Sequence, residues 1–171
     1  MYKMIILLEG NIGSGKSTFY NYIKEHCGEL GGKQIHFVEE PVSDWQNIRD
    51  NDGNLIEHFY KYPKKYSFCF QMTAYISRLA KLRNVLKTAK EDDIIITERC
   101  VFSDYNVFAK MLHSTGQIND IEFQCYTKWF DEFLKDIPEI LFVYIETDFD
   151  NCHSRVLSRS REGEESISKE Y

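Results

Sequence analysis

The sequence has no cysteine pair in C-x-x-C spacing, no excess of basic residues and no long apolar run. Its five cysteines are odd in number and far apart, which does not indicate a zinc site or a disulfide framework. We therefore expect reduced, mostly buried thiols. The net charge of −6 argues against a nucleic acid polymer as partner, because binding to a phosphate backbone depends on clustered lysine and arginine. A small anionic ligand remains compatible with this charge.

No apolar run approaches the ~20 residues that a membrane-spanning helix needs, so no membrane contact is expected. The first predicted strand begins close to the start of the given sequence, so we expect no targeting peptide. We expect a cytoplasmic protein. A length of 171 residues suits one well-buried core, and the prediction is a single domain over residues 1–171.

Short apolar runs alternate with helical periods along the chain. The runs predict strands at residues 3–8, 35–38, 93–97 and 140–145. Helices are predicted from the glycine-rich turn to about residue 26, then over about 63–90, 103–112, 119–134 and 147–158. The fourth opens with a capping box from Asn119 to Glu122, and Thr147 is expected to cap the last. The alternation predicts an α/β fold with a three-layer, doubly wound parallel sheet, in which ligands bind at the carboxyl ends of the strands.

Residues 10–17, GNIGSGKS, match the pattern G-x-x-x-x-G-K-[ST] between a predicted strand and a predicted helix. The glycines let consecutive N–H groups turn toward a phosphate, and the start of the helix adds partial positive charge. We assign phosphate binding to Gly10, Asn11, Ile12, Gly13, Ser14, Gly15, Lys16, Ser17 and Thr18. Lys16 would reach the outer phosphates and Ser17 would ligate Mg²⁺. This loop predicts a nucleoside triphosphate and a metal ion, but it leaves the acceptor of the phosphate open.

Charged residues follow two of the predicted strands. Glu40 comes just after the second strand, before a proline that favours an extended backbone. Glu98 and Arg99 end the third strand, so the carboxylate on the metal side is expected to be Glu98. The sequence lacks the N-K-x-D motif that a GTP switch would carry. The alternative interpretations are a surface carboxylate at Glu40 and a structural salt bridge between Glu98 and Arg99.

Several short motifs accompany the phosphate loop in separate segments: EPVSDW at 40–45, FQ at 70–71, ER at 98–99, SD at 103–104 and RSR at 159–161. In this order the set resembles the deoxyribonucleoside kinase family, over residues 4–171. The resemblance implies a P-loop nucleoside kinase in nucleotide salvage, which transfers the γ-phosphoryl group of ATP or another triphosphate to the 5′-hydroxyl of a deoxynucleoside. It also implies a homodimer that packs through the helix beginning near Asn119.

Carried over residue by residue, the resemblance implies catalytic roles that the chemistry also supports. Glu40 would act as general base, because a carboxylate beside the phosphate loop can take the proton of the acceptor hydroxyl. Arg99 would contact the acceptor oxygen or the transferring phosphoryl group, and Lys16 would stabilise the phosphates. A lid at about 155–167 would bring arginines over the donor phosphates. These are Arg155, Arg159 and Arg161, for which an exposed run of charge is the alternative.

The resemblance also implies the residues that bind the acceptor. An amide and aromatic rings would hold the base, namely Gln71, Trp45, Phe70 and Phe108. Arg78 and Asp104 match the deoxycytidine, deoxyadenosine and deoxyguanosine kinases, whereas relatives that accept thymidine have small or apolar residues there. Tyr60 and Glu164 would bind the 3′-hydroxyl of the sugar. Phe59, where relatives usually have methionine, and Gly163 depart from the family pattern.

Relatives continue after the lid with a helix and a last strand, which we expect to be absent from this chain. Two other functions stay open. A nucleoside monophosphate kinase would need cationic groups for the phosphate of its acceptor, and the Glu40-Pro41 and Glu98-Arg99 pairs favour an unphosphorylated acceptor instead. The other alternative is a nucleotide-binding module without turnover.

Overall fold

The computed structural model of the chain describes residues 3–138 and 140–159. This part of the chain divides into two compact units. The first unit runs to Glu40 and includes Leu79–Cys100 and Pro138–Ser158; the second comprises Pro41–Arg78, Val101–Ile137 and Arg159. A single domain over residues 1–171 stays a prediction.

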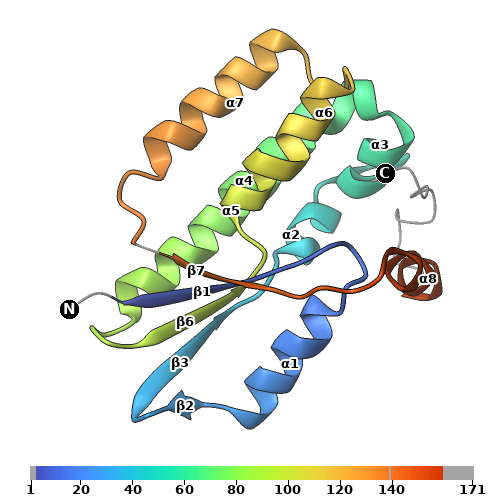
Figure 1. Cartoon of the computed structure of the whole chain (residues 1–171). Coiled ribbons are helices and arrows are strands. Elements are labelled where there is room, and N and C mark those ends of the chain that lie inside the picture. The colour runs from blue at the N-terminus through green and yellow to red at the C-terminus, as the bar shows by residue number, and fades with distance from the viewer. Residues whose placement is uncertain (1–2, 139, 160–171) are drawn as a thin grey trace. The chain divides into compact units, whose positions relative to one another are not determined.

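The first unit is built on a mostly parallel sheet, so the predicted α/β fold is confirmed (Figure 1). Its elements are β1 (Met4–Glu9), α1 (Lys16–His26), β2 (Glu29–Leu30), β3 (Lys33–Val38), β6 (Ile94–Glu98), β7 (Ile140–Tyr144) and α8 (Phe149–Arg159). The strand order is β2-β3-β6-β1-β7. The strands β3, β6, β1 and β7 run parallel, and the short β2 pairs antiparallel with β3. Parallel strands bring their carboxyl ends to one edge, which is where the predicted site residues of this unit lie.

Both faces of this sheet are buried at its centre, where β1 and β6 pair, whereas the edge strand β7 is largely exposed. On one face Leu8 and Ile96 pack with Tyr20 of α1. Figure 1 shows α1 beside the sheet. On the other face Ile5 and Ile95, which are paired in the register of β1 and β6, are fully buried. Since neighbouring side chains of a strand point to opposite faces, this explains why β6 has apolar residues in succession.

The second unit is mainly helical. Its elements are α2 (Val42–Asn47), β4 (Arg49–Asp50), β5 (Gly53–Asn54), α3 (Leu55–Lys61), the first part of α4 (Pro63–Thr88), α5 (Val101–Ser103), the π-helix η1 (Asp104–Ala109), α6 (Lys110–Ser114) and α7 (Asp120–Phe133). The last part of α4, from Leu79, belongs to the first unit. The rings of Tyr75 in α4 and Tyr126 in α7 lie 5.7 Å apart, so these two helices pack together.

The capping box predicted at Asn119 is confirmed. Asn119 Oδ1 accepts hydrogen bonds from the backbone N–H groups of Ile121 and Glu122, each at 3.0 Å, and the Glu122 carboxylate accepts from the Asn119 N–H. A second capping box, which the sequence analysis missed, joins Asn54 and Glu57 at the start of α3. Both fix a helix start by satisfying backbone donors that have no partner within the helix.

Two expectations from the sequence need correction. The helix predicted over about 103–112 is interrupted by the π-helix η1, a wider turn that no periodicity in this segment indicated. The thiols are not mostly buried, because Cys27, Cys69 and Cys125 are exposed while Cys100 and Cys152 are buried. Among the helices of the described residues, none is both long and apolar enough to cross a membrane.

Candidate active site

The phosphate loop connects β1 to α1 in the first unit. Gly10, Gly13 and Gly15 have φ angles of 151°, 78° and 98°, which side chains other than glycine rarely allow. The Lys16 ammonium turns back into this loop and donates hydrogen bonds to the carbonyl oxygens of Gly10 at 2.9 Å and Asn11 at 2.6 Å. The loop is therefore folded around the lysine that the sequence assigns to the phosphates.

Lys16 lies within a buried cluster of charges. Burial lowers its pKa to about 8, and the neighbouring Arg99 acts in the same direction. The carboxylates of Glu40, Glu98 and Glu9 act in the opposite direction. The charged form of this lysine is thus costly to hold, and an anionic phosphate placed beside it would offset that cost.

The α8 side of the unit holds the loop in place. A Cβ atom at Gly13 would lie 2.2 Å from the backbone carbonyl oxygen of Cys152, so the loop packs directly on α8. The Thr147 hydroxyl donates a hydrogen bond to the Ser14 carbonyl at 2.9 Å, and the Arg155 guanidinium lies 3.4 Å from the same oxygen. Arg155, assigned to the donor phosphates, therefore already borders the loop.

The prediction that Thr147 caps α8 is wrong. The capping contacts come from Asp148, whose Oδ1 accepts hydrogen bonds from the N–H groups of Asp150 at 3.0 Å and Asn151 at 3.3 Å. The helix begins one residue later than an N-cap at Thr147 would require, because Asp148 supplies the acceptor and frees the Thr147 hydroxyl for the phosphate loop.

A hydroxyl and a carboxylate meet at the end of β6. Ser17 Oγ donates to Glu98 Oε1 at 2.5 Å. Burial raises the pKa of Glu98, and the hydrogen bond from Ser17 opposes that rise. Both groups are hard oxygen ligands of the kind that Mg²⁺ prefers, so the donor set fits the predicted metal ion.

Arg99 has an unusual backbone conformation directly after β6. Its φ angle is 56°, in the left-handed region that residues other than glycine rarely adopt. Two hydrogen bonds hold it there: its N–H donates to the Leu8 carbonyl at 3.1 Å, and the Thr97 hydroxyl donates to its carbonyl at 3.2 Å. Strain of this kind persists where surrounding contacts enforce it, and it clusters at functional sites.

The Arg99 side chain is directed to Glu40. Its Nε lies 3.6 Å from Glu40 Oε1, and both side chains are largely buried. The preceding residue, Glu39, is exposed instead and pairs with Lys24, whose hydrogen bond lowers the pKa of the Glu39 carboxyl. The two consecutive glutamates therefore differ, and only Glu40 belongs to the charge cluster around Lys16.

The second unit holds a buried ion pair between Arg78 and Asp104. Arg78 is 9% exposed and Asp104 1%, and the Arg78 guanidinium donates to Asp104 Oδ1. The guanidinium carbon also lies 4.8 Å from the ring centre of Trp45, a cation–π contact. Asp104 is the first residue of the π-helix η1, which also contains Phe108. The pair that the sequence assigns to base recognition is thus formed within one unit.

Gln71 lies seven residues before Arg78 on α4. Its side chain is 2% exposed, and its Oε1 atom has no hydrogen-bond partner among the described residues. A buried amide oxygen without a partner is costly, and a ligand that donates a hydrogen bond there would remove the cost. This supports the assignment of Gln71 to a polar ligand.

Aromatic rings surround this part of α4. The rings of Trp45 and Phe70 meet edge to face at 5.5 Å, and those of Phe59 and Phe70 stack at 4.5 Å. Phe59 also contacts the ring of Tyr60 at 4.8 Å. The Phe59 ring, at the position where the sequence departs from the family pattern, therefore joins two of the residues assigned to the acceptor.

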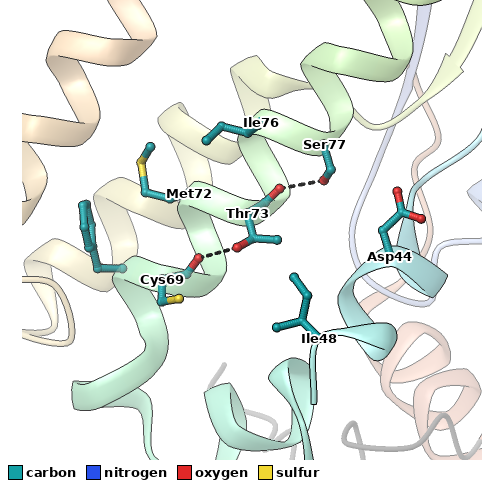
Figure 2. A pocket seen from close by; sticks show the side chains of 8 residues that line it. Asp44, Ile48, Cys69, Met72, Thr73, Ile76 and Ser77 are labelled. Carbon is teal, nitrogen blue, oxygen red and sulfur yellow. Dashed lines mark hydrogen bonds between the residues drawn. The ribbon is translucent and has the colours of Figure 1, made fainter. Parts of the chain in front are cut away.

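A separate apolar pocket of about 490 Å³ lies in the second unit between α2 and α4 (Figure 2). It is lined by Asp44, Ile48, Phe68, Cys69, Met72, Thr73, Ile76 and Ser77. None of these was assigned to the acceptor, so the pocket is distinct from the predicted binding residues. The role of Thr147 as a support of the phosphate loop was not predicted, because a hydroxyl before a helix usually indicates a cap.

Three predicted site residues come from the end of α8 or from the chain after it. Arg159 is described and exposed, at the end of α8. Arg161 and Glu164, together with the rest of the predicted lid from residue 160, lie outside the described residues.

The first strand of the parallel sheet leads through a glycine-rich loop into a helix that begins with Lys16 and Ser17. This arrangement defines the class as a P-loop protein that binds a nucleoside triphosphate. Comparison with known proteins then gives the family. The family model for deoxynucleoside kinases matches residues 6–171. The chain belongs to the deoxynucleoside kinase family.

Individual relatives agree with this. A fowlpox virus protein named "Probable deoxycytidine kinase" is 34% identical over 169 residues, covering 97% of this chain and 66% of its own length. Human deoxycytidine kinase is 33% identical over 187 residues, covering 97% of this chain and 70% of its own length. Deoxycytidine kinase 1 of Xenopus laevis is also 33% identical, with 68% of its own length covered. The chain thus spans about two thirds of the length of the curated relatives it matches, and the predicted family, enzyme class and fold are confirmed.

Proposed function

We propose that this chain transfers the γ-phosphoryl group of ATP, or of another nucleoside triphosphate, to the 5′-hydroxyl of a deoxynucleoside. The observation that carries the proposal is the position of Glu40. Its carboxylate is largely buried, faces Arg99 and contributes to the charge around Lys16, whereas Glu39 is engaged by Lys24 at the surface. A base held beside the phosphate loop is what the reaction needs from the protein.

In this reaction Glu40 accepts the proton of the 5′-hydroxyl as its oxygen attacks the γ-phosphorus. Arg99 orients the Glu40 carboxylate and offsets negative charge that develops on the transferring group. Lys16 and the N–H groups of the loop hold the phosphates, with Arg155 beside them. Ser17 and Glu98 would hold Mg²⁺, which when bound supplies charge neutralisation to the phosphate oxygens.

We assign the acceptor base to the polar cluster of the second unit. The partnerless Gln71 oxygen favours a base that donates a hydrogen bond, as the exocyclic amine of deoxycytidine or deoxyadenosine does. By the family resemblance, Arg78 and Asp104 match kinases of deoxycytidine, deoxyadenosine and deoxyguanosine and not the relatives that accept thymidine. Because the three relatives described above are named deoxycytidine kinases, deoxycytidine is the first substrate to test. Tyr60 is proposed to bind the 3′-hydroxyl of the sugar.

A homodimer that forms through α7 is part of the proposal. Ile121, Trp129 and Phe133 of this helix are 74%, 44% and 41% exposed, and the exposed Cys125 lies among them. Their spacing of four and eight residues puts an apolar stripe on one helix face, which a second copy would bury. Sedimentation velocity tests this, and a monomer at micromolar concentration would contradict it.

The experiment that tests the function is a product assay with the whole chain. Each of the four deoxynucleosides, and deoxycytidine monophosphate in addition, is incubated with ATP and Mg²⁺, and the products are separated by thin-layer chromatography. We expect a monophosphate from deoxycytidine. A diphosphate formed only from the monophosphate would identify a nucleoside monophosphate kinase instead, and unchanged ATP in every reaction would refute turnover.

Glu40→Gln separates catalysis from binding. We expect roughly 10²-fold lower kcat with acceptor binding retained, because the amide keeps the shape of the side chain but cannot take a proton. Glu39→Gln is the matched control, since Glu39 precedes Glu40 and is held at the surface by Lys24. Near-native kcat for Glu40→Gln would remove Glu40 from the role of base.

A further inference from the structure

The hydroxyl of Ser77 holds the indole of Trp45 in a fixed position. The buried Trp45 donates its Nε1–H to Ser77 Oγ at 2.9 Å. Ser77 lies on α4, and its hydroxyl donates to the Thr73 carbonyl at 2.6 Å (Figure 2). The Ala74 carbonyl lies 3.1 Å from the same hydroxyl oxygen. Because the hydrogen is used on the helix, the oxygen presents a lone pair to the indole, and the direction of that bond is set by α4 itself.

The same indole sets the environment of Arg78. The Arg78 guanidinium carbon lies 4.8 Å from the Trp45 ring centre, and the guanidinium donates to Asp104. The ring also packs in an apolar cluster with Ile56 and Ala74, and it meets the Phe70 ring edge to face. A planar guanidinium that lies over an aromatic face cannot turn out of that plane without losing the contact. The orientation of the indole therefore limits the orientation of Arg78.

We propose that Ser77 is a positioning residue for recognition of the acceptor base, acting through the indole of Trp45 on the Arg78 guanidinium. The inference rests on the proposed function, in which Arg78 and Asp104 read the base. Without the Ser77 hydroxyl, the buried indole N–H loses its acceptor. The indole then tilts toward another acceptor, and Arg78 loses the surface that keeps it aligned with Asp104.

Ser77→Ala tests the inference through substrate selection. We expect the KM for deoxycytidine to rise about 3- to 10-fold, the range that follows from loss of one neutral hydrogen bond, with kcat changed less than about twofold. The ratio of kcat/KM for deoxycytidine to that for thymidine should fall by a similar factor. Ser77→Thr, which keeps the hydroxyl, should restore the ratio.

Thr73→Val is the matched control. The Thr73 hydroxyl lies one turn earlier on α4 and donates to the Cys69 carbonyl at 2.8 Å, so it makes the same kind of bond to its own helix. Its removal should leave KM, kcat and the substrate ratio unchanged. An equal effect of Thr73→Val and Ser77→Ala would mean that the helix, and not the contact with Trp45, matters.

A double-mutant cycle with Trp45→Phe tests the contact itself, and its Trp45→Phe arm does not depend on the folding of Ser77→Ala. Trp45→Phe removes the indole N–H and keeps an aromatic face, so it should lower the substrate ratio by itself. Adding Ser77→Ala to it should change the ratio no further. Additive effects would overturn the inference.

Fluorescence gives a readout that does not depend on activity. The chain has two tryptophans, so Trp129→Phe leaves Trp45 as the single reporter. In that background Ser77→Ala should shift the Trp45 emission, whereas Thr73→Val should not. A parent enzyme that phosphorylates none of the four deoxynucleosides would refute the proposed function; a working parent whose substrate ratio and emission survive Ser77→Ala would refute only the role of Ser77.

Discussion

Removal of Asp104 alone should cost more stability than removal of Asp104 together with Arg78. Asp104 is 1% exposed and Arg78 9%, so the pair is desolvated. Asp104→Ala leaves a buried guanidinium without its carboxylate, which costs about 3–5 kcal/mol. The double variant Arg78→Met with Asp104→Ala leaves neither charge of the pair buried, and methionine fills much of the arginine volume. What is lost then is packing and the contact with Trp45, about 1–2 kcal/mol.

The assay is urea unfolding at pH 7, monitored by circular dichroism. It compares the parent, Asp104→Ala, Arg78→Met and the double variant. The double variant should recover about 2 kcal/mol relative to Asp104→Ala. The surface pair of Glu132 and Lys135, whose side chains are 64% and 67% exposed, provides the control cycle. Its coupling should be much smaller than that of the buried pair, because exposed ion pairs are screened by water and salt.

A double variant as unstable as the sum of the two single variants would refute the reasoning, because it would show that the two charges do not compensate each other. The same double variant also tests base recognition. It should shift the preference among deoxynucleosides toward thymidine, and an unchanged ranking would mean that the pair stabilises the unit without reading the base.

Three further variants test other contacts. Gly13→Ala should weaken ATP binding about tenfold or more, because the new Cβ would lie 2.2 Å from the Cys152 carbonyl oxygen and the φ angle of residue 13 is 78°. Calorimetric titration with ATP measures this, and an unchanged Kd would contradict it. The hydrogen bond with His36 holds the pKa of Asp93 below its ordinary value. The ionised Asp93 carboxylate therefore stabilises the folded protein above about pH 4, and this contribution is lost as the pH falls through the lowered pKa. Asp93→Asn should therefore lower the urea midpoint at pH 7, and its difference from the parent should shrink below about pH 4; an equal difference at both pH values would count against the pair. Asn119→Ala should lower Tm by about 2–4 °C, since loss of an N-cap costs about 1 kcal/mol, and calorimetry measures this.

The parts of the fold that local chemistry determines could be predicted from the sequence. The phosphate loop follows from glycine spacing before Lys16, and the long helix α4 from the proline at its first position with a helical period after it. The capping box at Asn119 needs residues only three apart. In each case the residues that specify the structure are close neighbours in the chain, so their pattern is visible without the fold.

Features that depend on distant partners could not be predicted in this way. Thr147 resembles an N-cap in sequence, yet its hydroxyl bonds to Ser14, 133 residues away, while Asp148 takes the cap. The left-handed conformation of Arg99 has no sequence signal either, because an arginine rarely adopts it. It results from the hydrogen bond of the Arg99 N–H to Leu8 on β1, a strand that neighbours β6 only in the folded sheet.

The acceptor residues combine both kinds of information. The seven-residue spacing of Gln71 and Arg78 places them on one face of α4, and this was visible in the sequence. The guanidinium of Arg78 is held by Trp45 on α2 and by Asp104 at the start of a π-helix, and neither position follows from periodicity. A helix face can therefore identify which residues are able to read a base, but their orientation depends on groups such as Ser77 that contact the readers only through a third side chain. Substitution of such groups should alter the choice of substrate while leaving the phosphate chemistry of the first unit intact.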